Sequence, residues 1–65
     1  MSTLRRQVGA LIKVHRDRAG LSQAELGDKV GKSLETIGRI ERGKLSPGLD
    51  TLEAIATALN VAPRD

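Results

Sequence analysis

A short stretch that carries its own helix-starting and helix-ending signals limits most strongly what this chain can fold into. Ser22 is followed three residues later by Glu25, a capping box in which each side chain satisfies a backbone N–H at the start of a helix. The helix that begins at Gln23 is expected to stop at Gly31, because glycine tolerates the left-handed conformation that ends a helix. A helix of about eight residues is therefore predicted here.

A second short helix follows directly. Ser33 can cap a helix over about residues 34–42, which would bury Ile37 and Ile40 and end at Gly43. Neither helix is stable alone at this length, so each must pack on its neighbours. A helix-turn-helix unit over about residues 22–42 is the economical interpretation, although other small helical bundles use the same signals.

Apolar residues at helical spacing predict one longer helix before this unit and one after it. The first covers roughly residues 3–19, closes at Gly20 and has an inner stripe made of Leu4, Val8, Leu11, Ile12 and Ala19. The second covers about residues 50–59, stops at Asn60 and has an inner face made of Leu52, Ile55, Ala56 and Leu59. The expected fold is all-α, a compact bundle of four short helices, with the start of a fifth left open.

The length and the cysteine count fit one domain over residues 1–65 that is held together by its apolar core. The chain has 65 residues, no cysteine and one histidine, so neither a disulfide nor a cysteine zinc site can form, and the single histidine cannot assemble a metal site. Helix bundles suit such small chains because most of their contacts are local. No metal and no cofactor are expected.

The hydropathy pattern indicates a cytoplasmic protein. Apolar runs reach only three or four residues, against the roughly 20 that a membrane-spanning helix needs. Arg5 and Arg6 are not followed by an apolar block, so a secretory signal is not expected either. The absence of cysteine also suits a reducing compartment.

Positive charge is concentrated in the middle of the chain. Residues 29–44 hold five basic and two acidic side chains, whereas residues 45–65 hold one basic and three acidic ones. Such a division is typical of a protein with one face toward a polyanion, and a solvated mixed-charge surface is the alternative.

The residue types for catalysis are missing. There is no cysteine nucleophile, no glycine-rich phosphate loop before a lysine, and no histidine arrangement for a serine triad. An enzyme is therefore not expected. Binding of single-stranded RNA is disfavoured as well, because no aromatic residue exists to stack on bases.

Residues 20–43, GLSQAELGDKVGKSLETIGRIERG, resemble the Cro/repressor helix-turn-helix family, also called the xenobiotic-response-element family. The resemblance extends upstream over residues 12–16 and downstream over residues 43–59. It implies a lambda-repressor-like domain that binds a double-stranded DNA operator as a transcriptional regulator, most often a repressor. The helix over residues 33–42 would then be the recognition helix in the major groove.

The same resemblance implies which side chains meet the DNA. Gln23, at the start of its helix, would contact a phosphate, and Ser33 would cap the recognition helix and also reach a phosphate. The side chains facing base edges or groove walls would be those of Lys32, Leu34, Glu35 and Arg39. Arg42 and Lys44 would hold the backbone on the far side.

For each of these residues a purely structural role is the alternative: a solvated helix start for Gln23, a plain cap for Ser33, and solubilising charges for the lysines and arginines. Leu34 and Glu35 stand where phage repressors of the family often carry glutamines, so the operator sequence is not predicted. Gly27 and Gly38 replace the usual Ala and Ser. Either they make the helices less rigid or a close helix approach needs them.

The resemblance also pairs Arg16 with Glu41, as an ion pair that ties the first helix to the end of the third. We expect this pair to be structural, and breaking one partner to cost more than replacing both. His15 is expected to be a partly buried histidine with its ring against the core, ahead of a pH switch or a catalytic role.

Family members act as two-fold dimers on DNA, so a homodimer is expected. In the family a fifth helix that supports dimer contact begins near Pro63, but this chain ends at Asp65. It is therefore expected to be either a C-terminally truncated piece or a short member. No small-molecule ligand is evident in this segment. The second class of function is an antitoxin-like or protein-interaction module in which DNA binding is secondary.

Overall fold

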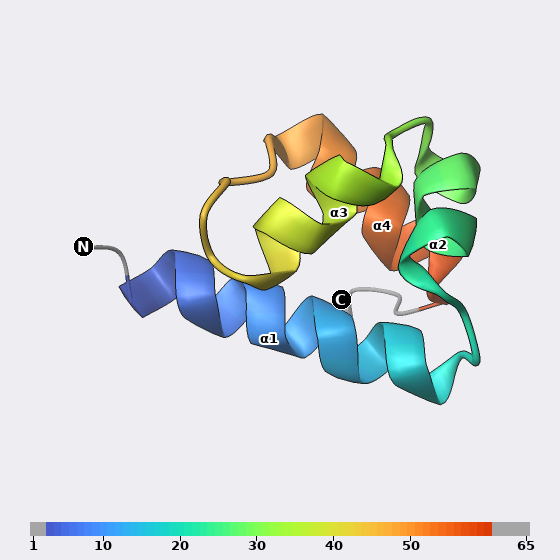
Figure 1. The fold of residues 1–65 in the computed structure, drawn as a ribbon, viewed down its shortest axis with the longest axis horizontal. Helices are drawn as coiled ribbons and strands as arrows, with labels where there is room; N and C mark the ends of the chain where they lie inside the picture. The colour runs from blue at the N-terminus through green and yellow to red at the C-terminus, as the bar shows by residue number, and fades with distance from the viewer. Residues whose placement is uncertain (1–2, 61–65) are drawn as a thin grey trace, which may run out of the picture.

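A computed structural model describes residues 3–60, which form four helices joined by short turns (Figure 1). The helices are α1 (Thr3–Arg18), α2 (Gln23–Val30), α3 (Leu34–Glu41) and α4 (Leu49–Ala58). All four predicted helices are present with ends within about one residue of the expected ones, and the described residues contain no strand. The all-α prediction is confirmed.

The capping residues start α2 and α3 as their sequences predict. The Glu25 N–H donates to Ser22 Oγ at 3.0 Å, and the Ser22 N–H donates to Glu25 Oε1 at 2.7 Å. At α3 the Thr36 N–H donates to Ser33 Oγ at 3.1 Å. These bonds satisfy helix N–H groups that have no partner within the helix.

Glycines in the left-handed region end the same two helices. Gly31 has φ 72°, and the next N–H, that of Lys32, donates back to the Gly27 carbonyl at 2.8 Å. Gly43 has φ 75°, and the Lys44 N–H donates to the Arg39 carbonyl at 2.9 Å. Both turns have the 6→1 bond of the Schellman motif, which lets the chain reverse direction within about three residues.

The core lies where the four helices meet. Its fully buried side chains are Leu26, Ile37, Ile40 and Ile55, joined by Ile12 and Leu59. In Figure 1, α1 runs along one side of the molecule, and α3 lies above it with α4 behind. Each fully buried Leu or Ile contributes about 1.5–3 kcal/mol relative to exposure, so these six side chains are the main stabilising feature of a chain without disulfides.

The predicted inner stripe of the first helix was wrong in part. Leu4 and Leu11 are 70% and 59% exposed, and Ala19 is exposed beyond the helix end. The buried line of α1 is instead Gly9, Ile12 and Arg16. Gly9 packs against the backbone of Ile40 and Glu41, so closely that a Cβ there would lie 2.7 Å from the Glu41 carbonyl oxygen. A search for apolar side chains misses a face made of a glycine and a paired arginine.

Among residues 3–60, no helix is long and apolar enough to cross a membrane. The start of a fifth helix, expected near Pro63, lies outside the described residues.

Candidate nucleic-acid interface

The helix α3 has one face in the core and one face in solvent. Ile37 and Ile40 are buried, whereas Leu34 is 54% exposed and the Arg39 and Glu35 side chains are 57% and 75% exposed. The residue pattern of α3 therefore anchors the helix by its inner face and leaves the outer face open to a partner.

Two charged side chains on this outer face form an ion pair one turn apart. Arg39 Nη2 lies 3.6 Å from Glu35 Oε2. An exposed pair of this kind adds little to stability, because solvent screens it and two long side chains must be ordered. Its consequence is positional: a guanidinium with several donors and a carboxylate acceptor are held side by side on the outside of α3.

The leading end of α3 consists of Lys32, Ser33 and Leu34, all exposed. The Ser33 hydroxyl is already engaged, since Oγ accepts from the Thr36 N–H and donates to Thr36 Oγ1 at 2.9 Å. Its capping role is therefore fulfilled within the protein itself. A phosphate would compete with Thr36 for the hydroxyl hydrogen.

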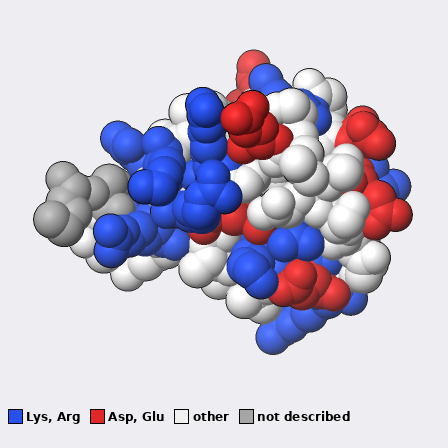
Figure 2. Space-filling view, viewed as in Figure 1, with Lys and Arg blue, Asp and Glu red and all other residues white. Residues whose placement is uncertain are grey.

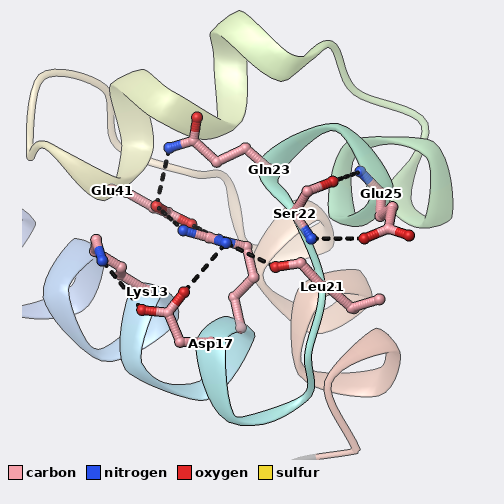
Figure 3. Close-up of polar contacts among 8 residues, drawn as sticks. Lys13, Asp17, Leu21, Ser22, Gln23, Glu25 and Glu41 are labelled. Atoms are coloured by element: carbon pink, nitrogen blue, oxygen red, sulfur yellow. Dashed lines mark hydrogen bonds and ion pairs between the residues drawn. The ribbon is translucent and has the colours of Figure 1, made fainter.

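The start of α2 is tied to the end of α3 through a buried carboxylate (Figure 3). Glu41 Oε2 accepts from Arg16 Nε at 2.6 Å, and Glu41 Oε1 accepts from Arg16 Nη2 and from Gln23 Nε2, each at 3.1 Å. Arg16 Nη1 also donates to the Leu21 carbonyl at 2.7 Å. The ion pair expected between Arg16 and Glu41 is thus present, and it joins α1, the start of α2 and α3.

The Arg16 guanidinium is stabilised in its charged form. The hydrogen bond that it donates to Glu41 raises the pKa of the Arg16 guanidinium, and this outweighs the opposite effect of burial. No buried side-chain N or O among the described residues lacks a hydrogen-bond partner. The Gln23 amide nitrogen uses one hydrogen on Glu41, so the carboxylate fixes the amide and leaves the second hydrogen for an acceptor outside.

Gly38 is a buried residue of α3 that lies beneath the point where the Gln23 and Arg42 side chains come together. A Cβ at Gly38 would lie 3.0 Å from Arg42 Nη1 and 3.6 and 3.7 Å from the two polar atoms of the Gln23 amide. The missing side chain thus brings an amide from α2 and a guanidinium from the end of α3 to one spot. Both groups carry N–H donors, which suits a phosphate oxygen.

Basic side chains surround this spot. Figure 2 shows Lys and Arg gathered over the N-terminal end of α1 and the segment that follows α3. Arg42 and Lys44, both expected there, are exposed. Arg6, which sequence reasoning did not include among the binding residues, lies against Gly43, because a Cβ on Gly43 would be 2.7 Å from Arg6 Cγ. Because 36 residues separate Arg6 from Gly43 in the chain, the sequence does not show that the two are in contact.

The acidic residues of α4 do not belong to this group of basic side chains. Asp50 and Glu53 line a shallow hollow of about 570 Å³ together with Lys29 of α2. His15 is half-buried and lines an apolar hollow of about 290 Å³ between α1 and α4. This agrees with the expected position of its ring against the core. Within residues 3–60 no group of three or more acidic or histidine side chains could hold a metal ion.

The structure therefore brings together some predicted residues and separates others. Gln23 and Arg42 meet at Gly38, Glu35 and Arg39 pair on the outer face of α3, and Lys44 follows Gly43 beside Arg6. Lys32, Ser33 and Leu34 occupy the opposite end of α3. The predicted residues therefore lie on the exposed face of α3, at its two ends and at the start of α2.

Comparison with known proteins places the chain among regulators. The model of a helix-turn-helix family matches residues 12–65. An uncharacterised HTH-type transcriptional regulator of Methanothermobacter thermautotrophicus is 45% identical over 49 residues, which is 75% of this chain and 71% of that protein.

Two further relatives are longer proteins. The immunity repressor protein of Bacillus phage phi105 is 41% identical over 54 residues, 83% of this chain and 38% of the repressor. The HTH-type transcriptional regulator SutR of Escherichia coli is 39% identical over 61 residues, 94% of this chain and 34% of SutR. The chain thus spans little more than a third of either protein. No solved structure matches the chain significantly.

Proposed function

Because the chain belongs to the helix-turn-helix family of the Cro/repressor, or xenobiotic-response-element, type, we propose that it binds specific sites on double-stranded DNA as a transcriptional regulator, acting as a repressor. One observation carries the proposal. The helix α3 buries Ile37 and Ile40 and presents its other face, flanked by basic side chains, to solvent. In this arrangement α3 enters the major groove and α2 lies across the backbone.

Three side chains of α3 would read base pairs. Arg39 offers the paired donors that fit guanine O6 and N7, and Glu35 offers an acceptor for cytosine N4. Leu34, at the leading end of the helix, suits the methyl group of thymine. Because Arg39 and Glu35 are held 3.6 Å apart, they would read neighbouring positions of the duplex together.

The remaining predicted residues would bind the backbone and set the register. Gln23 and Arg42 would share a phosphate above Gly38, and Lys44 would take another beyond the end of α3. Lys32 and Ser33 would meet the groove wall at the leading end. In this proposal Arg16 and Glu41 stay inside, where they hold Gln23 in place.

The protein would act in the cytoplasm as a homodimer, with residues 1–65 as its single DNA-binding domain. Two copies related by a two-fold axis would place their α3 helices in successive major grooves.

Selection from a library of random duplexes tests this function. We expect one enriched motif, arranged as an inverted repeat with half-site centres about 34 Å apart. Affinity for random DNA should also fall steeply with salt, with a log–log slope of about −0.9 for each phosphate contact. If no motif were enriched and the salt response were flat, the chain would be an antitoxin-like or protein-interaction module instead.

Two alanine variants separate base reading from backbone binding. Arg39→Ala should weaken binding to the selected site by about 1–3 kcal/mol and relax the preference at one base position. Lys44→Ala should weaken binding to all sequences alike and make the salt slope less steep by about 0.9. Equal, uniform losses for both variants in fluorescence anisotropy titrations would contradict these roles.

A further inference from the structure

The N-terminal end of α1 is fixed beside the end of α3. A Cβ added to Gly43 would lie 2.7 Å from Arg6 Cγ and 3.0 Å from Arg6 Cα. The glycine thus lets the first turns of α1 pack directly on the turn that carries Arg42 and Lys44. Basic residues from the N-terminal end of α1 and from the turn after α3 share one surface as a result (Figure 2).

The charge at this end of α1 is unfavourable for the helix itself. Arg6 lies within its first turns, the first turn contains no acidic residue, and the first acidic residue of the chain is Asp17. Since a helix N-terminus carries partial positive charge, cations there are destabilising and anions are stabilising. An external anion bound at this end of α1 would therefore reduce the unfavourable interaction between the positive charge of Arg6 and the helix N-terminus.

Arg6, Arg42 and Lys44 are all exposed, and no ion pair among residues 3–60 involves any of them. By contrast, Lys13, two turns further along α1, already pairs with Asp17 at 3.1 Å. Arg6 thus carries a charge without an ion-pair partner among residues 3–60, at the end of α1 that packs on the turn after α3.

We propose that the N-terminal end of α1, through Arg6, binds a further phosphate of the DNA backbone next to the one held by Lys44. This inference rests on the proposed function and adds to it a contact from outside the helix-turn-helix. The partner is a duplex phosphate because Arg6 continues the line of donors formed by Gln23, Arg42 and Lys44, and a duplex supplies phosphates at regular spacing.

The test compares Arg6→Gln with Lys29→Gln in salt titrations on random duplex DNA. Glutamine keeps the Cβ and Cγ of Arg6, so the contact with Gly43 is retained while the charge is lost. Lys29 is an exposed lysine of α2 beside Asp50 and Glu53, so its variant makes the same change in net charge elsewhere. We expect R6Q to make the log–log slope less steep by about 0.9, with K29Q leaving it unchanged and R6Q selecting the same motif as the wild type.

Arg6→Lys serves as the second variant and should keep the wild-type slope, since a lysine can also bind a phosphate. An R6Q slope equal to that of the wild type or K29Q would overturn the inference while leaving the proposed function intact. So would a loss of slope in R6K equal to that in R6Q, because the loss would then not follow the charge at position 6. A wild-type protein without salt-dependent DNA binding would instead refute the proposed function. Circular dichroism melts of each variant identify the temperature range in which all are folded.

Discussion

Arg16 and Glu41 illustrate how single residues hold this small fold. They are the charged residues that are buried within the described part of the chain, and each meets the other through two hydrogen bonds. Burying a charge is costly unless a partner and further hydrogen bonds compensate it. Here the Leu21 carbonyl and Asp17, whose Oδ1 lies 3.3 Å from Arg16 Nη1, add to the Arg16 side of the pair, and Gln23 adds to the Glu41 side. The pair is therefore stabilising only as long as it is complete.

Removing one partner should be far more damaging than replacing both. We expect Arg16→Met or Glu41→Leu alone to lower the free energy of unfolding by about 3–5 kcal/mol. Arg16→Met leaves the buried Glu41 carboxylate without its cation, and Glu41→Leu leaves the buried Arg16 guanidinium with only the exposed carboxylate of Asp17. The free energy of unfolding of the double variant should fall by much less, because no buried charge remains. Urea denaturation of the four proteins gives the coupling energy directly. Additive losses would mean that the pair acts as two independent residues.

At the scale of the helices, two interior glycines have different reasons to be there. A Cβ at Gly27 would lie 2.5 Å from the Lys32 carbonyl oxygen, which is backbone and cannot move aside without shifting the turn. A Cβ at Gly38 would meet only side-chain atoms, the nearest being the flexible end of Arg42. Of the two explanations that the sequence left open, the close approach holds at Gly27, whereas the buried Gly38 is covered only by the side chains of Arg42 and Gln23.

The same substitution should therefore have opposite effects at these positions. Gly27→Ala should destabilise the protein by about 1–3 kcal/mol through overpacking against the turn. Gly38→Ala should stabilise it by about 0.5–1 kcal/mol, since alanine is the better helix former. Thermal unfolding followed by circular dichroism measures both. A stabilising Gly27→Ala would show that the turn moves freely.

The start of α2 should respond to pH. The Ser22 N–H donates to the Glu25 carboxylate and holds the pKa of Glu25 below its ordinary value of 4.5. Because the folded-state pKa is the lower one, the carboxylate stabilises the fold above about pH 4.5, and this stabilisation is lost as pH falls through the folded-state pKa.

Glu25→Gln keeps an acceptor for the Ser22 N–H and removes only the charge. We expect the variant to melt below the wild type at neutral pH, and the difference to shrink in acid. Glu53→Gln, at an exposed position of α4 with no cap, controls for the loss of a surface carboxylate. A difference between E25Q and the wild type that is constant from neutral to acidic pH would contradict the charge-based explanation.

For the whole molecule, the local signals predicted most of the fold. Ser22, Ser33, Gly31 and Gly43 set the ends of α2 and α3 through bonds that span only a few residues, so the sequence displays them directly. The core side chains Ile37, Ile40 and Ile55 were predicted for the same reason, because their spacing follows the helix period.

The sequence predicted less where contacts are made through backbone or between distant residues. The packing of Gly9 on Ile40, and of Arg6 on Gly43, depends on where α1 crosses α3, which no local pattern encodes. The exposed leucines of α1 were misplaced because the buried face of this helix is built from a glycine and an ion-paired arginine. Similarly, the proximity of Gln23 and Arg42 at Gly38 depends on how α2 packs on α3, which the sequence does not show.

The division of α3 into an inner and an outer face has an evolutionary consequence. Leu34, Glu35 and Arg39 contribute nothing to the core, while Ile37 and Ile40 contribute nothing to the surface that a partner would meet. Random change on the outer face is thus free to alter preference without eroding the scaffold. A few substitutions on the outer face of α3 could therefore change the DNA sequence that the domain prefers. The same face could be replaced by design with that of another recognition helix.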